Sequence, residues 1–215
     1  RYKGDFHARS LNSYNHLLQL IFGQITACTL LRDICLCIKA HHSNLYHLGI
    51  RLQVNQSSLS RVNEKRDYRI FQDFGYYLIG EVRPLYTQED IPLVDLDNTI
   101  FALDSTSISV SINLAAWASG KYSRGAVKMH TLLDLRGSIP TFIHISDGTW
   151  HDSNALDYIK FEQNAIYTMD KAYVDLVALH KMDSIGAYFV TRTKSVMRYR
   201  ITESLECREE GVMSD

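Results

Sequence analysis

Residues 99–109 read TIFALDSTSIS, and the interpretation of the whole chain starts from this stretch. An apolar run, Ile100–Leu103, ends in the carboxylate of Asp104, and small hydroxyl residues follow at once. A continuous apolar run of this kind predicts a central strand that is covered on both faces. A carboxylate at the end of such a strand costs free energy unless another group pairs with it. The sequence therefore raises the question of what pairs with Asp104.

A second segment, AIYTMD (165–170), has the same pattern and ends in Asp170. Between the two, GAVKMHTLLDL and SIPTFIHI predict two strands, and the short RGS turn that joins them indicates a hairpin. Residues 151–158 and 173–184 predict helices, and GAYFVT (186–191) predicts a fifth strand. The predicted order is β-β-β-α-β-α-β, which is a mixed α/β sheet.

The first 90 residues are expected to be helical. The predicted helices begin at Asn12 or Ser13, at Thr26 or Thr29, and at Ser57 or Ser58. The first should bury one apolar stripe made of Tyr14, Leu17, Leu18, Ile21 and Phe22. The second should run through Ala40 and the third, either continuous or interrupted, to about Glu81, with Arg61, Lys65 and Arg69 spaced four apart on one face. Residues 84–98, PLYTQEDIPLVDLDN, are loop-like, so we expect two domains, 1–90 and 93–215.

The composition is that of an ordinary globular protein. The chain has 215 residues, 46% of them hydrophobic and 22% charged, and no apolar run approaches the ~20 residues of a membrane span. Residues 1–92 carry 11 Lys and Arg against 8 Asp and Glu, and the remainder carries 12 against 16. This asymmetry is compatible with a nucleic-acid-binding module followed by a metal-using one, and equally with solvated faces. Three of the four cysteines lie in an apolar helical stretch, which favours reduced thiols in a cytosolic protein.

Asp104 and Asp170 are the candidates for chemistry. Ligands of mixed α/β sheets gather at the carboxyl ends of strands, and two carboxylates that meet there repel each other unless a cation lies between them. Ligation by oxygen alone indicates Mg²⁺ or Mn²⁺. A pair of such ions roughly 3.5–4 Å apart suits phosphoryl transfer. An aspartate after a strand is also common as a turn or helix cap, and the spacing alone leaves that alternative open.

Other site types are less well supported. A hydrolase triad of Asp104, Ser105 and either His130 or His151 lacks the G-x-S-x-G turn that a nucleophile of this kind needs. A zinc site has its candidate ligands close together in sequence, but their spacing matches no standard finger; they are Cys35, Cys37, His41 and His42. His130 is expected to be a packing residue. A role for His151 in positioning metal or DNA stays open.

Nearly the whole chain resembles bacterial insertion-sequence transposases of the DDE class. The blocks that resemble their catalytic domain are FALDSTSIS, GAVKMHTLLDLRGSIPTFIHISDG, HDSNALD, IYTMDKAYVD and YFVTRTKS. The blocks that resemble their helical N-terminal domain are LLRD, LYHLGI and SSLSRVNEKRDYRIF. The resemblance implies a ribonuclease H-like fold and Mg²⁺-dependent DNA cleavage and strand transfer. It also implies terminal inverted repeats and target DNA as partners, a homodimer on DNA, and a bacterial cytoplasmic location at the nucleoid.

The resemblance assigns Asp104 as the first catalytic aspartate and Asp170 as the second. The third member, a glutamate in a later helical motif, has no match before Asp215, so we expect a chain truncated ahead of it. The carboxylates nearest the end lie in no such motif; they are Glu203, Glu206, Glu209 and Glu210. The family favours Arg and Gly where this chain has Lys171 and Ala172. The alternative hypothesis is therefore an inactive relative that binds DNA or full-length transposase without cleaving.

Basic residues are expected to contact DNA phosphates, largely without regard to sequence. On the helical domain these are Arg61, Lys65, Arg66 and Arg69, and near the two aspartates they are Lys171, Arg192 and Lys194. Weaker candidates flank the hairpin, namely Lys121, Arg124 and Lys128.

Overall fold

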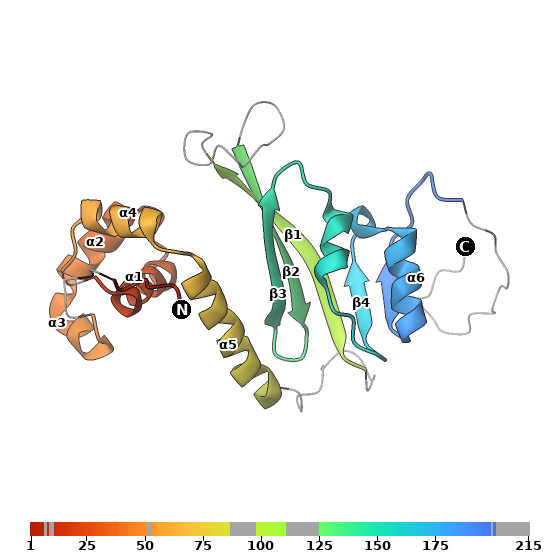
Figure 1. Ribbon diagram of the computed structural model, residues 1–215, viewed down its shortest axis with the longest axis horizontal. Coiled ribbons are helices and arrows are strands. Elements are labelled where there is room, and N and C mark those ends of the chain that lie inside the picture. Colours follow the sequence, from red (N-terminus) through yellow and green to blue (C-terminus); the bar gives the residue numbers. More distant parts are fainter. Residues whose placement is uncertain are drawn as a thin grey trace, which may run out of the picture. The chain divides into compact units, whose positions relative to one another are not determined.

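The computed structural model describes residues 1–6, 8, 11–50, 53–86, 98–110, 125–198 and 200. The chain divides into two compact units, Arg1–Val82 and Arg83–Asp215 (Figure 1). The division falls within one helix, α5 (Arg69–Tyr86), so the segment that was predicted as a loop from residue 84 is still helical through Tyr86. Residues 87–97 of that segment lie outside the described residues. Within the described part of the chain, no helix has the length and apolar character needed to cross a membrane.

The first unit is built of short helices. They are α1 (Ser13–Ile25), α2 (Leu31–Ala40), α3 (His42–Leu45), the 3₁₀ helix η1 (Tyr46–Leu48), α4 (Gln56–Lys65) and the first part of α5. Asn12 caps α1 as predicted, because its side chain accepts a hydrogen bond from the Asn15 amide at 2.8 Å. The predicted cap of α4 was wrong: Asn55 takes that role and accepts from the Ser58 amide at 3.0 Å.

Apolar side chains from four segments meet in the core of this unit. They are Leu11, Ile34, Ile38, Leu45, Ile50 and Leu59. The predicted apolar stripe on α1 was wrong in part, because Tyr14 and Ile21 are 60% and 43% exposed. Gly23 faces α2 instead, where a Cβ atom would lie 2.5 Å from the Cδ1 atom of Ile34. Close packing of α1 on α2 therefore requires glycine at this position.

His16 makes the stability of the first unit depend on pH in a predictable direction. It is 1% exposed, and burial together with the charge of Arg66 lowers its pKa to about 4. The unfolded chain binds a proton at this histidine below about pH 6.5, so the stabilisation is complete above that pH and is lost as the pH falls towards 4. We expect the unit to lose about 2 kcal/mol between pH 7 and pH 5.

Urea unfolding followed by NMR signals of α1 at the two pH values measures this loss. The variant His16→Leu removes the titrating group and should show a flat profile over the same range. Equal stability of the wild-type chain at pH 7 and pH 5 would contradict the argument.

The second unit contains a five-stranded mixed sheet with the strand order β3-β2-β1-β4-β5. The strands are β1 (Ile100–Val110), β2 (Gly125–Asp134), β3 (Ile139–Asp147), β4 (Ile166–Met169) and β5 (Tyr188–Thr191). The first three are antiparallel, and β1, β4 and β5 are parallel (Figure 1). The predicted mixed sheet, its hairpin and its central strand are confirmed, and the fold is ribonuclease H-like.

One face of the sheet carries the core of the second unit. Side chains such as Phe101, Leu103 and Tyr167 pack there against η3 (Asp152–Tyr158), η4 (Lys171–Tyr173) and α6 (Leu176–Ile185). The helix predicted at 151–158 is present as η3, although it is a 3₁₀ helix and not an α-helix. Its cap is the side chain of His151, which accepts from the Ser153 amide. The expectation that β1 is covered on both faces holds at the start of the strand only. On the face opposite to the core, Ile100 is buried, Ala102 is half-buried and Asp104 is exposed.

Candidate active site

Asp104 and Asp170 lie side by side on two neighbouring parallel strands. The last paired residues of β1 and β4 are Leu103 and Met169, and each aspartate is the next residue along its strand. Neighbouring strands lie about 4.7–4.9 Å apart, and successive side chains point to opposite faces. Because Leu103 and Met169 are buried in the core, Asp104 and Asp170 both lie on the opposite face, and both are exposed. The fold thus brings two carboxylates to the same level of the sheet.

The sequence pattern predicted that the strand ends at Asp104, and this was wrong. β1 continues to Val110 and stays paired with β2, where Ser105 lies opposite His130 and Ser109 opposite Ala126. The partner that ends here is β4, which has only four residues. Asp104 therefore marks the point at which β1 loses its parallel neighbour and presents a free edge next to Asp170.

Asp170 already has a cationic partner. Its Oδ1 atom accepts hydrogen bonds from the Lys171 amide at 2.6 Å and from Nη2 of Arg192 at 2.6 Å. The Arg192 guanidinium, followed by the Lys171 amide, lowers the pKa of Asp170 below its usual range. Asp170 is therefore ionised, and a cation that binds it would compete with the Arg192 guanidinium for its Oδ1 atom.

The three basic residues predicted to lie near the aspartates differ in whether their charged groups are free to contact a ligand. The side chain of Arg192 is 75% exposed and Lys171 is exposed, so both can meet a ligand at this edge of the sheet. Lys194 is half-buried and its ammonium group donates to the carbonyl of Val174 at 2.8 Å. Lys121 and Arg124 lie outside the described residues.

The opposite face of the same strands holds a polar cluster that sequence reasoning missed. It consists of Ser105, Lys128, His130, Ser146, Asp152 and Tyr173, which we call the Ser105–Tyr173 network. Lys128, predicted as a weak DNA contact, is 17% exposed and pairs with Asp152 at 3.0 Å. His130 is buried as a packing residue would be, yet both its ring nitrogens lie within hydrogen-bonding distance of hydroxyl groups. The feature of the sequence that could have revealed this cluster is the presence of polar residues at core-facing positions of β1 and β2.

The geometry does not support the hydrolase alternative. The two ring nitrogens of His130 contact Tyr173 and Ser146, and the Ser105 hydroxyl donates to Asp152 at 3.2 Å. His151 contacts Ser153 instead.

The described residues also hold no group of three His, Cys, Asp or Glu side chains arranged to bind a metal ion. The zinc hypothesis therefore has no site there, and Cys28 and Cys37 are free thiols whose sulfur atoms lie 3.8 Å apart. The same finding means that no third carboxylate joins Asp104 and Asp170 within the described part of the chain. The carboxylates of residues 203–210 lie outside it.

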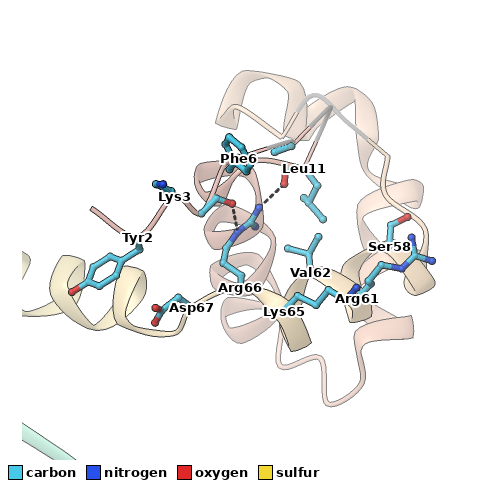
Figure 2. Close-up of a pocket in the computed structure, with 12 residues that line it drawn as sticks. Tyr2, Lys3, Phe6, Leu11, Ser58, Arg61, Val62, Lys65, Arg66 and Asp67 are labelled. Atoms are coloured by element: carbon cyan, nitrogen blue, oxygen red, sulfur yellow. Dashed lines mark hydrogen bonds between the residues drawn. The ribbon is translucent and has the colours of Figure 1, made fainter.

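The basic residues of the helical unit do not form one continuous stripe. α4 ends at Lys65 and α5 begins at Arg69, so the predicted helix is broken between them. The side chain of Arg66 is only 5% exposed, and its guanidinium donates to the carbonyls of Gly4, Leu11 and Asn12. Figure 2 shows the bond to Leu11. This arginine ties the N-terminal segment to α4. Arg69 forms a bidentate pair with Asp67.

Arg61 and Lys65 are exposed and line a pocket of about 600 Å³ at the surface of this unit (Figure 2). The N-terminal segment adds Lys3, a cation that the helix-based prediction could not find because it lies outside any helix. Tyr2 and Phe6 line the same pocket. Cations and aromatic side chains together form a surface of the kind that nucleic acids contact.

Two carboxylates at one level of adjacent parallel strands in a ribonuclease H-like sheet define a candidate metal-dependent phosphoryl-transfer site. A family model described as "Transposase DDE domain" matches residues 95–212, which is more than half of the chain. The chain belongs to this family of DDE transposases, a class that uses divalent metal ions. A second model, described as "Domain of unknown function (DUF4372)", matches residues 1–51.

The chain is also similar to a curated protein of Sinorhizobium fredii (strain NBRC 101917 / NGR234) named "Putative transposase y4zB". The two are 27% identical over 150 residues, which cover 70% of this chain and 40% of that protein. The matched segment is thus less than half the length of this relative.

Proposed function

We propose that this chain carries the catalytic centre of a DNA transposase that cleaves DNA at the ends of an insertion element and joins them to target DNA. The observation that supports this most directly is the placement of Asp104 and Asp170 at one level of adjacent strands, both exposed on the same face. In the proposed reaction, water attacks a phosphodiester and releases a 3′-hydroxyl, which then attacks a phosphodiester of the target. We further propose that the protein acts as a homodimer on DNA, by analogy with its family.

Asp104 and Asp170 are the proposed ligands of Mg²⁺, for which Mn²⁺ can substitute. The donor set fits a hard divalent cation, because both donors are carboxylate oxygens. The Arg192 guanidinium holds Oδ1 of Asp170, so a cation would bind the other oxygen of that carboxylate or displace the guanidinium. A cation bound there would polarise the scissile phosphate and make water a better nucleophile. A third carboxylate would have to come from outside the described residues.

The chain's own cations would orient the DNA backbone at this edge. Arg192 and Lys171 flank Asp170 and are exposed, so a phosphate near the two carboxylates would meet two positive side chains. Arg192 can present two parallel N–H donors to phosphate oxygens, whereas Lys171 offers a single point charge. Their proposed role is to hold the phosphodiester and to offset the negative charge of the aspartates.

The helical unit is the proposed duplex-binding surface, with Lys3, Arg61 and Lys65 as phosphate contacts. We expect the double variant Arg61→Ala/Lys65→Ala to bind all duplexes more weakly, whatever their sequence. It should also lower the slope of log affinity against log salt concentration by about two, because two phosphate contacts are lost. Fluorescence anisotropy over a series of salt concentrations measures both effects.

The matched control is Arg32→Ala/Lys39→Ala, which removes two exposed cations of α2 that do not line the pocket. An identical salt slope for the two double variants would refute the assignment of the pocket to DNA.

The experiment that tests the proposed activity is nicking of supercoiled and element-end DNA by the whole chain in Mg²⁺, Mn²⁺ or EDTA. We expect nicking that requires a divalent cation. If the chain binds DNA but nicks none of it in either metal, the enzyme proposal fails for this chain, and the inactive DNA-binding relative becomes the better description.

A further inference from the structure

We propose that the Ser105–Tyr173 network is a positioning device that sets the separation of Asp104 and Asp170. This inference rests on the proposed function, since it concerns the same two carboxylates. The members of the network are positioning residues, because they lie on the opposite face of the sheet and act through the backbone.

The backbone pairing alone does not fix the two carboxylates relative to each other. The ladder between β1 and β4 ends at Leu103 and Met169, one residue before the aspartates. Beyond that point β1 pairs only with β2, and the chain after Asp170 turns into η4. Something other than the ladder has to hold the Asp104 and Asp170 segments together.

The network is joined to both of these segments. Ser105 directly follows Asp104 in β1. Tyr173 ends the turn that Asp170 begins, and its amide donates to the Asp170 carbonyl at 3.0 Å. A displacement of either hydroxyl-bearing residue would therefore move the neighbouring carboxylate.

A continuous set of polar contacts connects Ser105 with Tyr173. The Ser105 hydroxyl donates to Oδ1 of Asp152 at 3.2 Å, and Nδ1 of His130 lies 3.8 Å from the same oxygen. Nδ1 of His130 is also 3.1 Å from the Tyr173 hydroxyl. Lys128 donates to Asp152 at 3.0 Å and to the carbonyl of Trp150 at 3.2 Å, which fixes the carboxylate from the other side.

Because the polar contacts of the network are buried, they restrict how the two segments can move relative to each other. His130 and Tyr173 are 0% and 1% exposed, so water cannot readily replace their partners. Apolar contacts hold the sheet and η4 together but tolerate sliding, whereas a satisfied polar network in a low-dielectric setting favours one arrangement. Residues that orient metal ligands from behind affect metal affinity by about 10–100-fold when they are removed.

The test is Mn²⁺ binding to the whole chain by isothermal titration calorimetry. Ser105→Ala and Tyr173→Phe each remove one oxygen atom from a different end of the network. We expect both to weaken Mn²⁺ binding by about tenfold or more, with little change in melting temperature. The matched control is Tyr167→Phe, which removes another buried tyrosine hydroxyl that accepts from the Glu162 amide, outside the network; its Mn²⁺ affinity should stay at the wild-type value.

Asp104→Asn separates the two ways in which this can fail. If the wild-type chain binds no Mn²⁺, or if Asp104→Asn binds it equally well, the proposed site and the positioning proposal both fall. If Asp104→Asn loses binding while Ser105→Ala and Tyr173→Phe bind as tightly as the wild type, only the positioning proposal is overturned. A loss of affinity in Tyr167→Phe as large as in the other two would also overturn it, because the effect would then belong to the core as a whole and not to the network.

Discussion

Asp104→Asn is expected to lower metal-dependent DNA nicking by at least about a thousandfold, because a bound cation contributes several kcal/mol to the transition state and each 1.36 kcal/mol is a factor of ten. Asparagine keeps the size of the side chain but removes the charge that would hold the cation. Asp170→Asn should have an effect of the same order. DNA affinity should change little, since neither carboxylate is proposed to contact DNA directly.

The control for this pair is Asp183→Asn, which neutralises an exposed aspartate on α6 in the same unit. Its nicking rate should remain within a factor of about two of the wild type, as is usual for surface substitutions. If Asp104→Asn retained most of the wild-type rate, Asp104 would be no more than an exposed strand residue, and the site would have to be sought elsewhere.

Arg66→Ala is expected to destabilise the helical unit by about 3 kcal/mol, since charge-assisted hydrogen bonds to three carbonyls are lost and those carbonyls are left without this donor. The guanidinium is 5% exposed and joins Gly4, Leu11 and Asn12 to the start of the α4–α5 connection. Amide hydrogen exchange of α1 and α4 measures the loss.

Arg61→Ala is the informative comparison, because Arg61 is exposed on the same helix. It should change stability by no more than about 0.5 kcal/mol while it weakens DNA binding. The opposite outcome, with Arg66→Ala stable and defective only in DNA binding, would return Arg66 to the DNA-contacting set that the sequence predicted.

The strand pattern was predictable because the apolar runs are long and end sharply. TIFALD and AIYTMD each combine a buried run with a terminal carboxylate, and the order of elements then leaves few sheet topologies. The parallel pairing of β1 with β4, which places Asp104 beside Asp170, follows from that pattern. The length of β1 does not follow from that pattern, because its polar residues after Asp104 pair with β2 on one side only.

What the sequence could not predict depends on contacts between distant residues. The position of the break after Lys65 was hidden by the regular four-residue spacing of Arg61, Lys65 and Arg69. The burial of Arg66, which does not belong to that spacing, is explained by its bonds to the carbonyls of Leu11 and Asn12. The ion pair of Lys128 with Asp152 joins β2 to η3 between residues 24 positions apart in the sequence. Local sequence patterns do not predict such a pair. The exposed basic residues were identifiable from sequence, whereas buried polar residues need the fold.

The central claim is that Asp104 and Asp170 together hold a divalent cation. With hydrogen peroxide as oxidant and ascorbate as reductant, Fe²⁺ bound in place of Mg²⁺ is oxidised to Fe³⁺ and releases hydroxyl radicals that cut the polypeptide backbone close to the metal, so the cut sites map its position. We expect cuts in the two segments around Asp104 and Asp170, suppressed by excess Mg²⁺ and absent in Asp104→Asn. Cuts confined to other segments, or cuts at these two that persist in Asp104→Asn, would contradict it.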